Sequence, residues 1–358
     1  MGFELDDRMV IGVSSRALFD LTAENEIFET QGLEAYCRYQ VEHEQEILKP
    51  GPGFRLIRSL LKLNEYGGGQ ALTEVIIMSH NSPDTSLRVF NSIAHYGLPI
   101  TRSVLVSGAS LGPYLAAFQT DLFLSACEED VQCAIDAGIA AGIICTEGVP
   151  AYGMSSHASG GPLQDGPEAG GTLRRSFQDG REGEGASRGQ LLGGEEESLR
   201  RSRRIIPMPQ AAGQIRLAFD GDAVLFTDES EQIFQEQGLS AFEENERLHA
   251  REPLAEGPFA SFLKKLSDLQ RRLGTEDCPI RTALVTSRSA PAHERVIRTM
   301  RAWNVRVDEA FFLGGLDKRD ILRAFGAQIF FDDQVKHTQS AAQAVPAARV
   351  PYRRASAR

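Results

Sequence analysis

Residues 215–226 read IRLAFDGDAVLF, and this stretch decides how the second half of the chain folds. It is a short, mostly apolar run that ends at two aspartates flanking a glycine. Apolar runs of this length that end in turn residues are typical of buried strands. We therefore predict a strand over Ile215–Phe219, with Asp220 and Asp222 at its carboxyl end.

Further apolar runs alternate with helical periodicity downstream of this strand. Strands alternating with helices predict an α/β fold with a doubly wound parallel sheet, in which ligands bind at the carboxyl ends of the strands. The other expected strands are Arg281–Val285, Glu309–Leu313 and Gln328–Phe331, and the expected helices are Phe259–Leu273, Ala292–Trp303 and Asp317–Phe325.

The two aspartates have the chemistry of a phosphoryl-transfer site. A carboxylate at a strand end can attack phosphorus and form an aspartyl-phosphate, and we assign this role to Asp220. Asp222 can protonate the leaving oxygen and then deprotonate the attacking water. Gly221 lets the backbone turn tightly between them. Taken alone, the Asp-Gly-Asp triplet is explained equally well as an ordinary turn.

Hydroxyl and cationic groups follow the next predicted strand. Thr286 can hold a phosphate oxygen beside backbone N–H groups, and Ser287 follows it directly. Arg288 can clamp the phosphate or another anionic part of a substrate. As an alternative, Thr286 and Ser289 cap the helix that begins near Ala290-Pro291.

Lys318 opens a predicted helix after Gly314-Gly315. An ammonium group at this place can neutralise both the phosphate and Asp220, so that nucleophile and substrate do not repel each other. The alternative is a solvated lysine on the protein surface, where most lone charged helix residues lie.

Two carboxylates, Asp332 and Asp333, follow the apolar run Ile329-Phe330-Phe331. Such a pair is costly to bury unless a cation lies between the two. Mg²⁺ prefers one or two carboxylates, waters and substrate oxygens. We expect it to be held by Asp220, Asp332 and the backbone carbonyl of Asp222, with Asp333 reached through water. Asp333 could also cap the next helix.

The first half of the chain repeats this pattern, which indicates an ancient duplication. When the chain is slid along itself until Ser14 meets Asp220, Gln31-Gly32-Leu33 falls on Gln237-Gly238-Leu239 and Gly51-Pro52 falls on Gly257-Pro258. One further position of shift aligns Arg88-Val89 with Arg295-Val296. We therefore expect two related domains, over residues 1–146 and 214–358.

The first copy lacks the reactive groups of the second. The places of Asp220, Asp222, Thr286, Lys318 and Asp332-Asp333 are taken by Ser14, Arg16, Ser79, Leu111 and Ser125-Ala126. No phosphoryl chemistry is expected there. The first copy then serves either as a packing partner or as an effector pocket, in which Ser14, Arg16 and Ser79 hold a nucleotide phosphate without cleaving it.

Two segments of different character connect these elements. Residues 147–213 are rich in glycine and charge, and we predict a mostly disordered linker, with docking of the basic Arg200–Arg204 stretch on an acidic surface as the alternative. Residues 227–257 predict a small helical cap. Its Phe234 and Phe242 either pack in the cap or stack on a base, and Gly238 should break its helix.

Composition limits the partners and the compartment. The net charge is −11, which argues against a nucleic-acid polymer as partner. The five cysteines show no metal-binding spacing, which favours free thiols in a reducing compartment. No signal pattern opens the chain and no apolar run reaches membrane-spanning length. We expect a soluble, cytoplasmic protein.

The four motifs resemble those of the haloacid-dehalogenase-like phosphatase superfamily, whose D-x-D-x-[TV] signature is matched by residues 220–224. Longer stretches resemble the cytosolic 5′-nucleotidase I family: VSSRALFD (13–20), LKPGPGF (48–54), HYGLPITR (95–102), FDGDAVLFTDESE (219–231), CPIRTALVTSRSA (278–290) and IFFDDQ (329–334). The resemblance implies magnesium-dependent hydrolysis of nucleoside 5′-monophosphates, AMP foremost, by a cytosolic, oligomeric enzyme that ADP can activate.

Residue roles follow from the motifs and the resemblance together. The predicted catalytic residues are Asp220, Asp222, Thr286 and Lys318, the substrate-binding residues are Thr286, Ser287, Arg288 and Lys318, and the magnesium site comprises Asp220, Asp222, Asp332 and Asp333. Two other functions compete: a phosphatase of the same chemistry acting on another small phosphomonoester, and a nucleotide-sensing binding protein. A pure binding protein would have no need of Asp222, which speaks against the last.

Overall fold

The computed structural model describes residue 5 and residues 7–146, 214–274 and 278–352. The linker predicted over residues 147–213 lies outside the described residues. The strands are β1 (Met9–Val13), β2 (Thr73–Ser79), β3 (Arg102–Leu105), β4 (Leu122–Ser125), β5 (Ala140–Ile144), β6 (Ile215–Phe219), β7 (Ile280–Thr286), β8 (Glu309–Phe312), β9 (Ile329–Asp332) and β10 (Ala347–Arg349).

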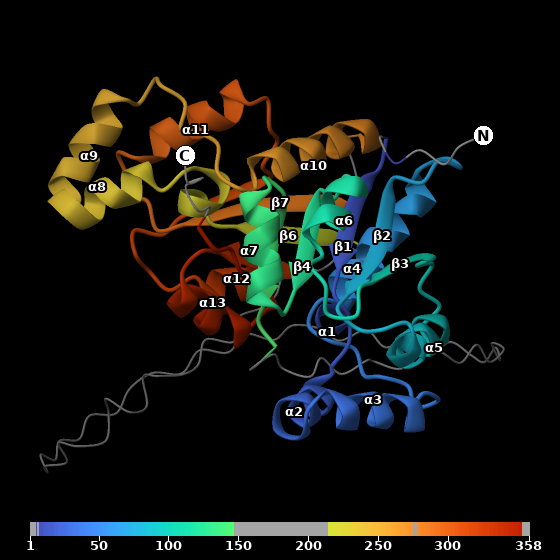
Figure 1. Ribbon diagram of the computed structural model, residues 1–358. Helices are drawn as coiled ribbons and strands as arrows, with labels where there is room; N and C mark the ends of the chain where they lie inside the picture. Colours follow the sequence, from blue (N-terminus) through green and yellow to red (C-terminus); the bar gives the residue numbers. More distant parts are fainter. Residues whose placement is uncertain (1–4, 6, 147–213, 275–277, 353–358) are drawn as a thin grey trace, which may run out of the picture. The chain divides into compact units, whose positions relative to one another are not determined.

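Helices connect most of these strands (Figure 1). They are α1 (Ser15–Leu18), α2 (Thr22–Gln31), α3 (Leu33–Glu42), α4 (Phe54–Lys62), α5 (Leu87–His95), α6 (Gly112–Ala117), α7 (Glu128–Asp136), α8 (Glu229–Gln237), α9 (Leu239–Leu248), α10 (Ala260–Leu273), α11 (His293–Ala302), α12 (Arg319–Phe325) and α13 (Val335–Ala342). Short helical turns, η1 (Leu63–Tyr66), η2 (Asp84–Ser86) and η3 (Gly221–Leu225), complete the described elements.

The ten strands of the described residues form one sheet, in the order β3-β2-β1-β4-β5-β10-β9-β6-β7-β8. Neighbouring strands are parallel except β5 and β10, which pair antiparallel where the two halves of the chain meet. Within each half, the first strand lies between the second and the fourth. The predicted α/β class with a large, mostly parallel sheet is confirmed.

Both faces of the second half of the sheet are covered by helices. Leu217 and Phe219 of β6 belong to the same apolar core as Phe262 of α10. The intervening residue, Ala218, packs in a separate core with Phe325 of α12. This alternation follows from the two-residue period of a strand, which sends successive side chains to opposite faces. The near-continuous apolar runs of the sequence are therefore strands buried on both sides.

The strands and helices predicted in the second half are present, and β6 has the predicted bounds. Because β6, β7 and β9 run parallel, their carboxyl ends reach the same edge of the sheet. Asp220, Thr286 and Asp332 lie at these three strand ends. The topology thus brings together residues that are far apart in the chain.

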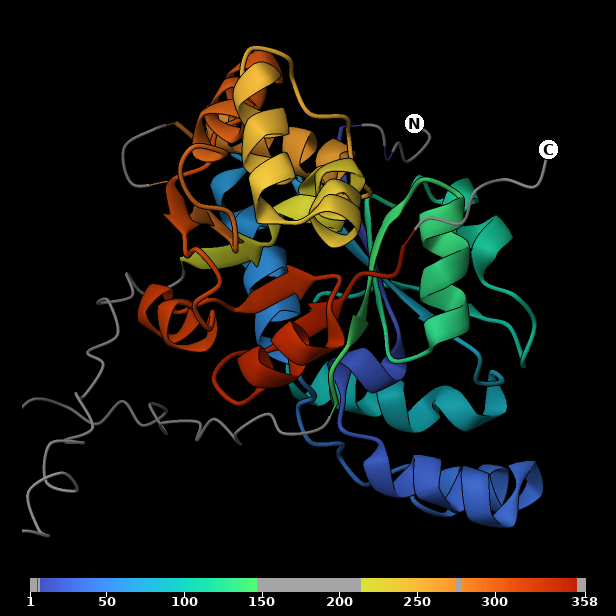
Figure 2. The same ribbon diagram turned by 90° about the vertical axis from the view of Figure 1, so that its left-hand side faces the viewer.

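The segment predicted as a cap forms a pair of helices, α8 and α9, separated by Gly238 (Figure 2). Gly238 adopts a φ of 84°, which breaks the helix as predicted because side-chain-bearing residues rarely take this backbone angle. Phe234 and Phe242 meet edge to face across the pair, with ring centroids 6.3 Å apart. The pair α2–α3 has the same construction around Gly32 in the first half.

Among the described residues, no helix combines the length and the apolar character that crossing a membrane requires.

The contact between β5 and β10 gives a test of the fold. A Cβ at Gly142 would lie 2.9 Å from the Cβ of Ala348 and 3.3 Å from the ring of Phe331. Gly142→Val should therefore lower the free energy of unfolding by about 1–3 kcal/mol, because the added methyls overpack this contact. Denaturant unfolding measures the effect.

The matched control is Ile143→Val, on the neighbouring, half-buried position of β5. It removes one methylene and should cost less than about 1.5 kcal/mol. Equal stability of Gly142→Val and the wild type would contradict the packing described for this contact.

Candidate active site

Asp220 is the first residue after β6, and the strand fixes its place. Its backbone N–H donates to the carbonyl of Phe331 at 2.8 Å, which ties it to neighbouring β9. Its carboxylate is buried and accepts from the N–H of Gly221 at 2.7 Å. The chain then turns sharply, because Ala223 has a φ of 59°. This turn sends the chain away from the sheet and leaves Asp220 at the strand end.

Lys318 joins Asp220 to Asp332. Its Nζ lies 2.9 Å from Oδ1 of Asp220 and 2.6 Å from Oδ2 of Asp332. All three side chains are buried. The interpretation of Lys318 as a solvated surface lysine is therefore wrong, and the segments that carry Asp220, Lys318 and Asp332 meet as the motif order predicted.

The charges of this cluster do not balance. Burial raises the pKa of Asp220 well above its ordinary value, because the attraction of Lys318 is opposed by repulsion from Asp332. Burial also acts on Asp332, but Lys318 and His337 outweigh it and hold its pKa low. Burial alone would lower the pKa of Lys318, yet the two carboxylates raise it. One ammonium thus faces two buried carboxylates, an arrangement that favours a further cation.

The donor atoms suit a divalent cation. One ligand atom each from Asp220, Asp332 and His337 lie within 4.8 Å of one another. Carboxylate oxygens are the hard ligands that Mg²⁺ takes. His337 was not predicted, and its Nδ1 lies 3.2 Å from Oδ2 of Asp332. Its place in the first turn of the helix after Asp332-Asp333 was the signal that could have found it.

Asp333 has a hydrogen-bond partner outside this cluster. The hydroxyl of Tyr352 donates to its Oδ2 at 2.6 Å, and burial raises the pKa of Asp333 to about 6. The helix that follows is not capped by Asp333. No side chain caps α13, and Asp332 accepts from the N–H of Gln334, the residue before the helix, at 2.8 Å. Contact of Asp333 with a metal through water stays a prediction.

Asp222 points to an arginine. Nε and Nη2 of Arg288 donate to its two carboxylate oxygens at 2.9 and 2.6 Å. Arg288 is buried, and its Nη1 donates to Glu246 of α9 at 2.6 Å. The arginine predicted to clamp substrate phosphate therefore contacts two of the chain's own carboxylates.

The predicted phosphate-binding hydroxyls end β7. Thr286 is buried, and a Cβ on Gly221 would lie 3.3 Å from its Oγ1, which places the hydroxyl beside the loop of Asp220. Ser287 is exposed next to it. Helix α11 begins later, after Ala292, without a side-chain cap. The alternative in which Thr286 and Ser289 cap this helix is therefore wrong.

A hollow of about 300 Å³ opens at this edge of the sheet. It is lined by Gly315, Leu316, Asp317, Lys318, Lys336, His337 and Ser340. Lys318 and His337 belong both to this hollow and to the cluster around Asp332. A ligand in the hollow would therefore reach the cluster directly.

At the matching strand ends of the first half, the described residues hold no lysine between two carboxylates, although ligand atoms of His80, Cys127 and Asp130 lie within 4.8 Å of one another. Ser14, Ser79 and Ser125 follow or end β1, β2 and β4, and all three are buried. Leu111, at the place predicted to match Lys318, is fully buried. These four positions hold neutral side chains, and the absence of phosphoryl chemistry in the first half stays a prediction.

Comparison with known proteins matches the chain to a family model and to curated relatives. The family model described as 5′-nucleotidase matches residues 1–157 and 202–357. The human protein "Cytosolic 5′-nucleotidase 1B" is 35% identical over 343 residues, which is 93% of this chain and 47% of that protein. The chain thus spans about half the length of the curated relative it matches. No solved structure matches.

The family model covers most of the chain, and the human relative covers nearly all of it. The second stretch of the family model, residues 202–357, includes the buried cluster at the carboxyl ends of β6 and β9. The chain therefore belongs to the 5′-nucleotidase family, as its motifs predicted.

Proposed function

We propose that the second half of the chain hydrolyses nucleoside 5′-monophosphates, AMP foremost, to the nucleoside and inorganic phosphate. The observation that carries the proposal is the contact of Lys318 with both Asp220 and Asp332, three buried charges from separate segments. Family membership supports the nucleotide as substrate class. The preference for AMP rests on the resemblance alone.

In the first step, a carboxylate oxygen of Asp220 attacks the phosphorus and the bond from phosphorus to the 5′-oxygen breaks. Protonated Asp222 gives its proton to this oxygen, so that the nucleoside leaves as a neutral alcohol. Lys318 and Thr286 hold the phosphoryl oxygens, with Ser287 beside them. The ammonium offsets the negative charge that gathers between nucleophile and substrate.

In the second step, water attacks the phosphorus of the aspartyl-phosphate and gives a proton to the Asp222 carboxylate. The bond between phosphorus and Asp220 breaks. Inorganic phosphate leaves, and both aspartates return to their starting forms.

Mg²⁺ is the cofactor we propose, held by Asp220, Asp332 and the Asp222 backbone, with Asp333 reached through water and His337 at the edge of the site. The two buried carboxylates around one ammonium fit such a cation. When bound, it supplies positive charge that offsets the charge developing on the phosphoryl oxygens.

The finer architecture belongs to the same proposal. We assign a haloacid-dehalogenase-like, doubly wound fold that arose by duplication, with a non-catalytic copy over residues 1–146, a catalytic copy over 214–358 and a cap at 227–257. The matching strand orders of the two halves and the helix pairs around Gly32 and Gly238 support it. ADP as an effector of the first copy, homo-oligomers, a cytosolic location and the lack of a nucleic-acid partner stay predictions.

The nucleophile is tested by Asp220→Asn. Phosphate release from AMP with Mg²⁺ should fall by about 10³-fold or more, because an amide does not attack phosphorus. The matched control is Asp268→Asn, on the exposed face of α10, which should keep the wild-type rate. Equal rates for Asp220→Asn and the wild type would remove Asp220 from its assigned role.

The substrate class is tested with a panel of phosphomonoesters. The wild type should hydrolyse nucleoside 5′-monophosphates with a higher kcat/KM than sugar phosphates. The reverse order would favour the other small-phosphomonoester phosphatase, and tight nucleotide binding with negligible turnover would favour the sensing protein.

The cation site is tested by thermal unfolding. The raised pKa of Asp220 means that the folded chain keeps a proton that the unfolded chain loses above its ordinary pKa of 3.8, so the metal-free protein loses stability as pH rises above that value. Mg²⁺ competes with this proton. It should therefore raise Tm more at pH 7.5 than at pH 5.

Asp332→Asn removes one of the proposed ligands and should abolish most of the Mg²⁺-dependent rise in Tm. Chelation with EDTA should return the wild type to its metal-free Tm. A rise of the same size in Asp332→Asn would place the cation elsewhere.

A further inference from the structure

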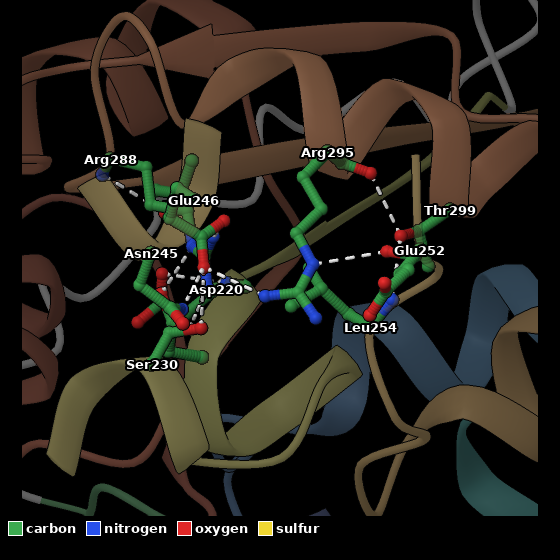
Figure 3. Close-up of polar contacts among 12 residues, drawn as sticks. Asp220, Ser230, Asn245, Glu246, Glu252, Leu254, Arg288, Arg295 and Thr299 are labelled. Atoms are coloured by element: carbon green, nitrogen blue, oxygen red, sulfur yellow. Dashed lines mark hydrogen bonds and ion pairs between the residues drawn. The ribbon is translucent and has the colours of Figure 1, made fainter. Parts of the chain in front are cut away.

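Glu246 is a fully buried carboxylate on α9, in the helix pair that stands over the second half of the sheet. Figure 3 shows it between Arg288 and Arg295. Its Oε2 accepts from Nη1 of Arg288 at 2.6 Å, and its Oε1 accepts from Nη1 of Arg295 at 3.0 Å. The hydroxyl of Ser230, on α8, also donates to Oε1 at 2.8 Å. Nothing in the sequence pattern marked this residue.

Arg288 continues the chain of contacts to the proposed acid/base. One part of its guanidinium binds Glu246, and the other binds both oxygens of Asp222. The guanidinium also lies over the ring of Phe242, 5.4 Å from its centroid. A planar, forked donor held at two ends has little freedom to turn. The position of Asp222 is therefore linked to that of α9.

The first half, which lacks the proposed catalytic residues, has a helix pair of its own, α2–α3, and serves as a comparison for α8–α9. There Arg88 takes the place of Arg295, and Nε of each arginine donates at 3.0 Å to a backbone carbonyl, that of Glu46 or of Glu252. Arg88 binds a buried carboxylate as well, Glu24 of α2, at 2.6 Å. In each half, one buried ion pair thus joins the helix pair to the helix after the second strand. The pair is Glu24 with Arg88 of α5 in the first half and Glu246 with Arg295 of α11 in the second.

The second arginine occurs only in the half that carries Asp220. Asn81 stands at the place of Arg288, and Gln40 stands at the place of Glu246, the same number of positions after the glycine of the helix pair. Gln40 donates to the hydroxyl of Tyr36, which in turn donates to Asn81 at 3.0 Å. The first half thus makes this second connection with neutral side chains, and only the half that carries Asp220 makes it with a buried ion pair.

We propose that Glu246 is a positioning residue for the hydrolysis proposed above. It fixes Arg288, and Arg288 in turn holds the carboxyl group of Asp222 in one place through bonds to both of its oxygens. The helix pair α8–α9 then does more than cover the site, because its Glu246 sets the geometry of the acid/base. A displacement of a catalytic group by about 1 Å can cost about 10²-fold in rate.

The test is Glu246→Gln, which keeps the size of the side chain and removes its charge. We expect kcat to fall by about 10- to 100-fold, since Arg288 loses its charged partner and Asp222 its fixed place. KM should change by less than about threefold, because Glu246 contacts none of Thr286, Ser287 and Lys318, the groups proposed to bind phosphate.

The matched control is Glu24→Gln in the first half, which likewise removes a buried carboxylate from a buried arginine, Arg88. Both variants should lower Tm, because each leaves a buried guanidinium short of a partner. Only Glu246→Gln should lower kcat, measured well below the Tm of either variant. A wild-type kcat in Glu246→Gln, or an equal loss in Glu24→Gln, would overturn the positioning role.

The role of Glu246 can be tested even if the proposed substrate class is wrong. If the wild type cleaves another phosphomonoester in place of nucleotides, the same kcat comparison is made with that ester. A double-mutant cycle in unfolding needs no substrate at all. Glu246→Gln and Asp222→Asn combined should lower Tm by less than the sum of the two single effects, because they share Arg288. Additive effects would overturn the link between Glu246 and Asp222.

Discussion

The contact of one lysine with two buried carboxylates is the constraint on which the site depends. Removing a charge from water is costly, and a buried carboxylate is tolerated only beside an opposite charge or a good set of donors. Lys318 meets this need for both Asp220 and Asp332, but one ammonium cannot balance two carboxylates. The raised pKa of Asp220 records the remaining imbalance. A site with this excess of negative charge favours a bound cation, and that cation can in turn hold an anionic substrate.

The same constraint explains the difference between the halves of the chain. Both halves order their strands alike, and both carry a helix pair bound to the sheet layer by a buried arginine and a carboxylate. At the strand ends of the first half, however, serines and a buried leucine replace the charged groups. Neutral side chains can be buried there without any partner cation. The first half can therefore keep the architecture without the electrostatic cost of the site.

Around the central cluster, further buried ion pairs link the helix pair to the reactive loop. Glu246 faces two arginines and is completely shielded from water. Buried ion pairs are weak evidence for added stability, because desolvation offsets most of their attraction. Their geometric specificity is the better explanation for this network. It connects Asp222 to α9 through a single rigid guanidinium, whereas the first half uses neutral side chains at the matching positions.

The sequence by itself determined the fold class, the order of strands and helices in the second half and the motif residues at the strand ends. These features follow from local rules, since apolar periodicity marks buried strands and parallel strands share one edge. Asp220, Lys318 and Asp332 were predictable as a group for this reason. Only the tertiary structure decided the partners: Arg288 with Asp222 and Glu246, Tyr352 with Asp333, and His337 with Asp332. Side-chain pairing between distant segments depends on how the helices pack against the sheet. No local pattern in the sequence specifies which of these side chains come into contact.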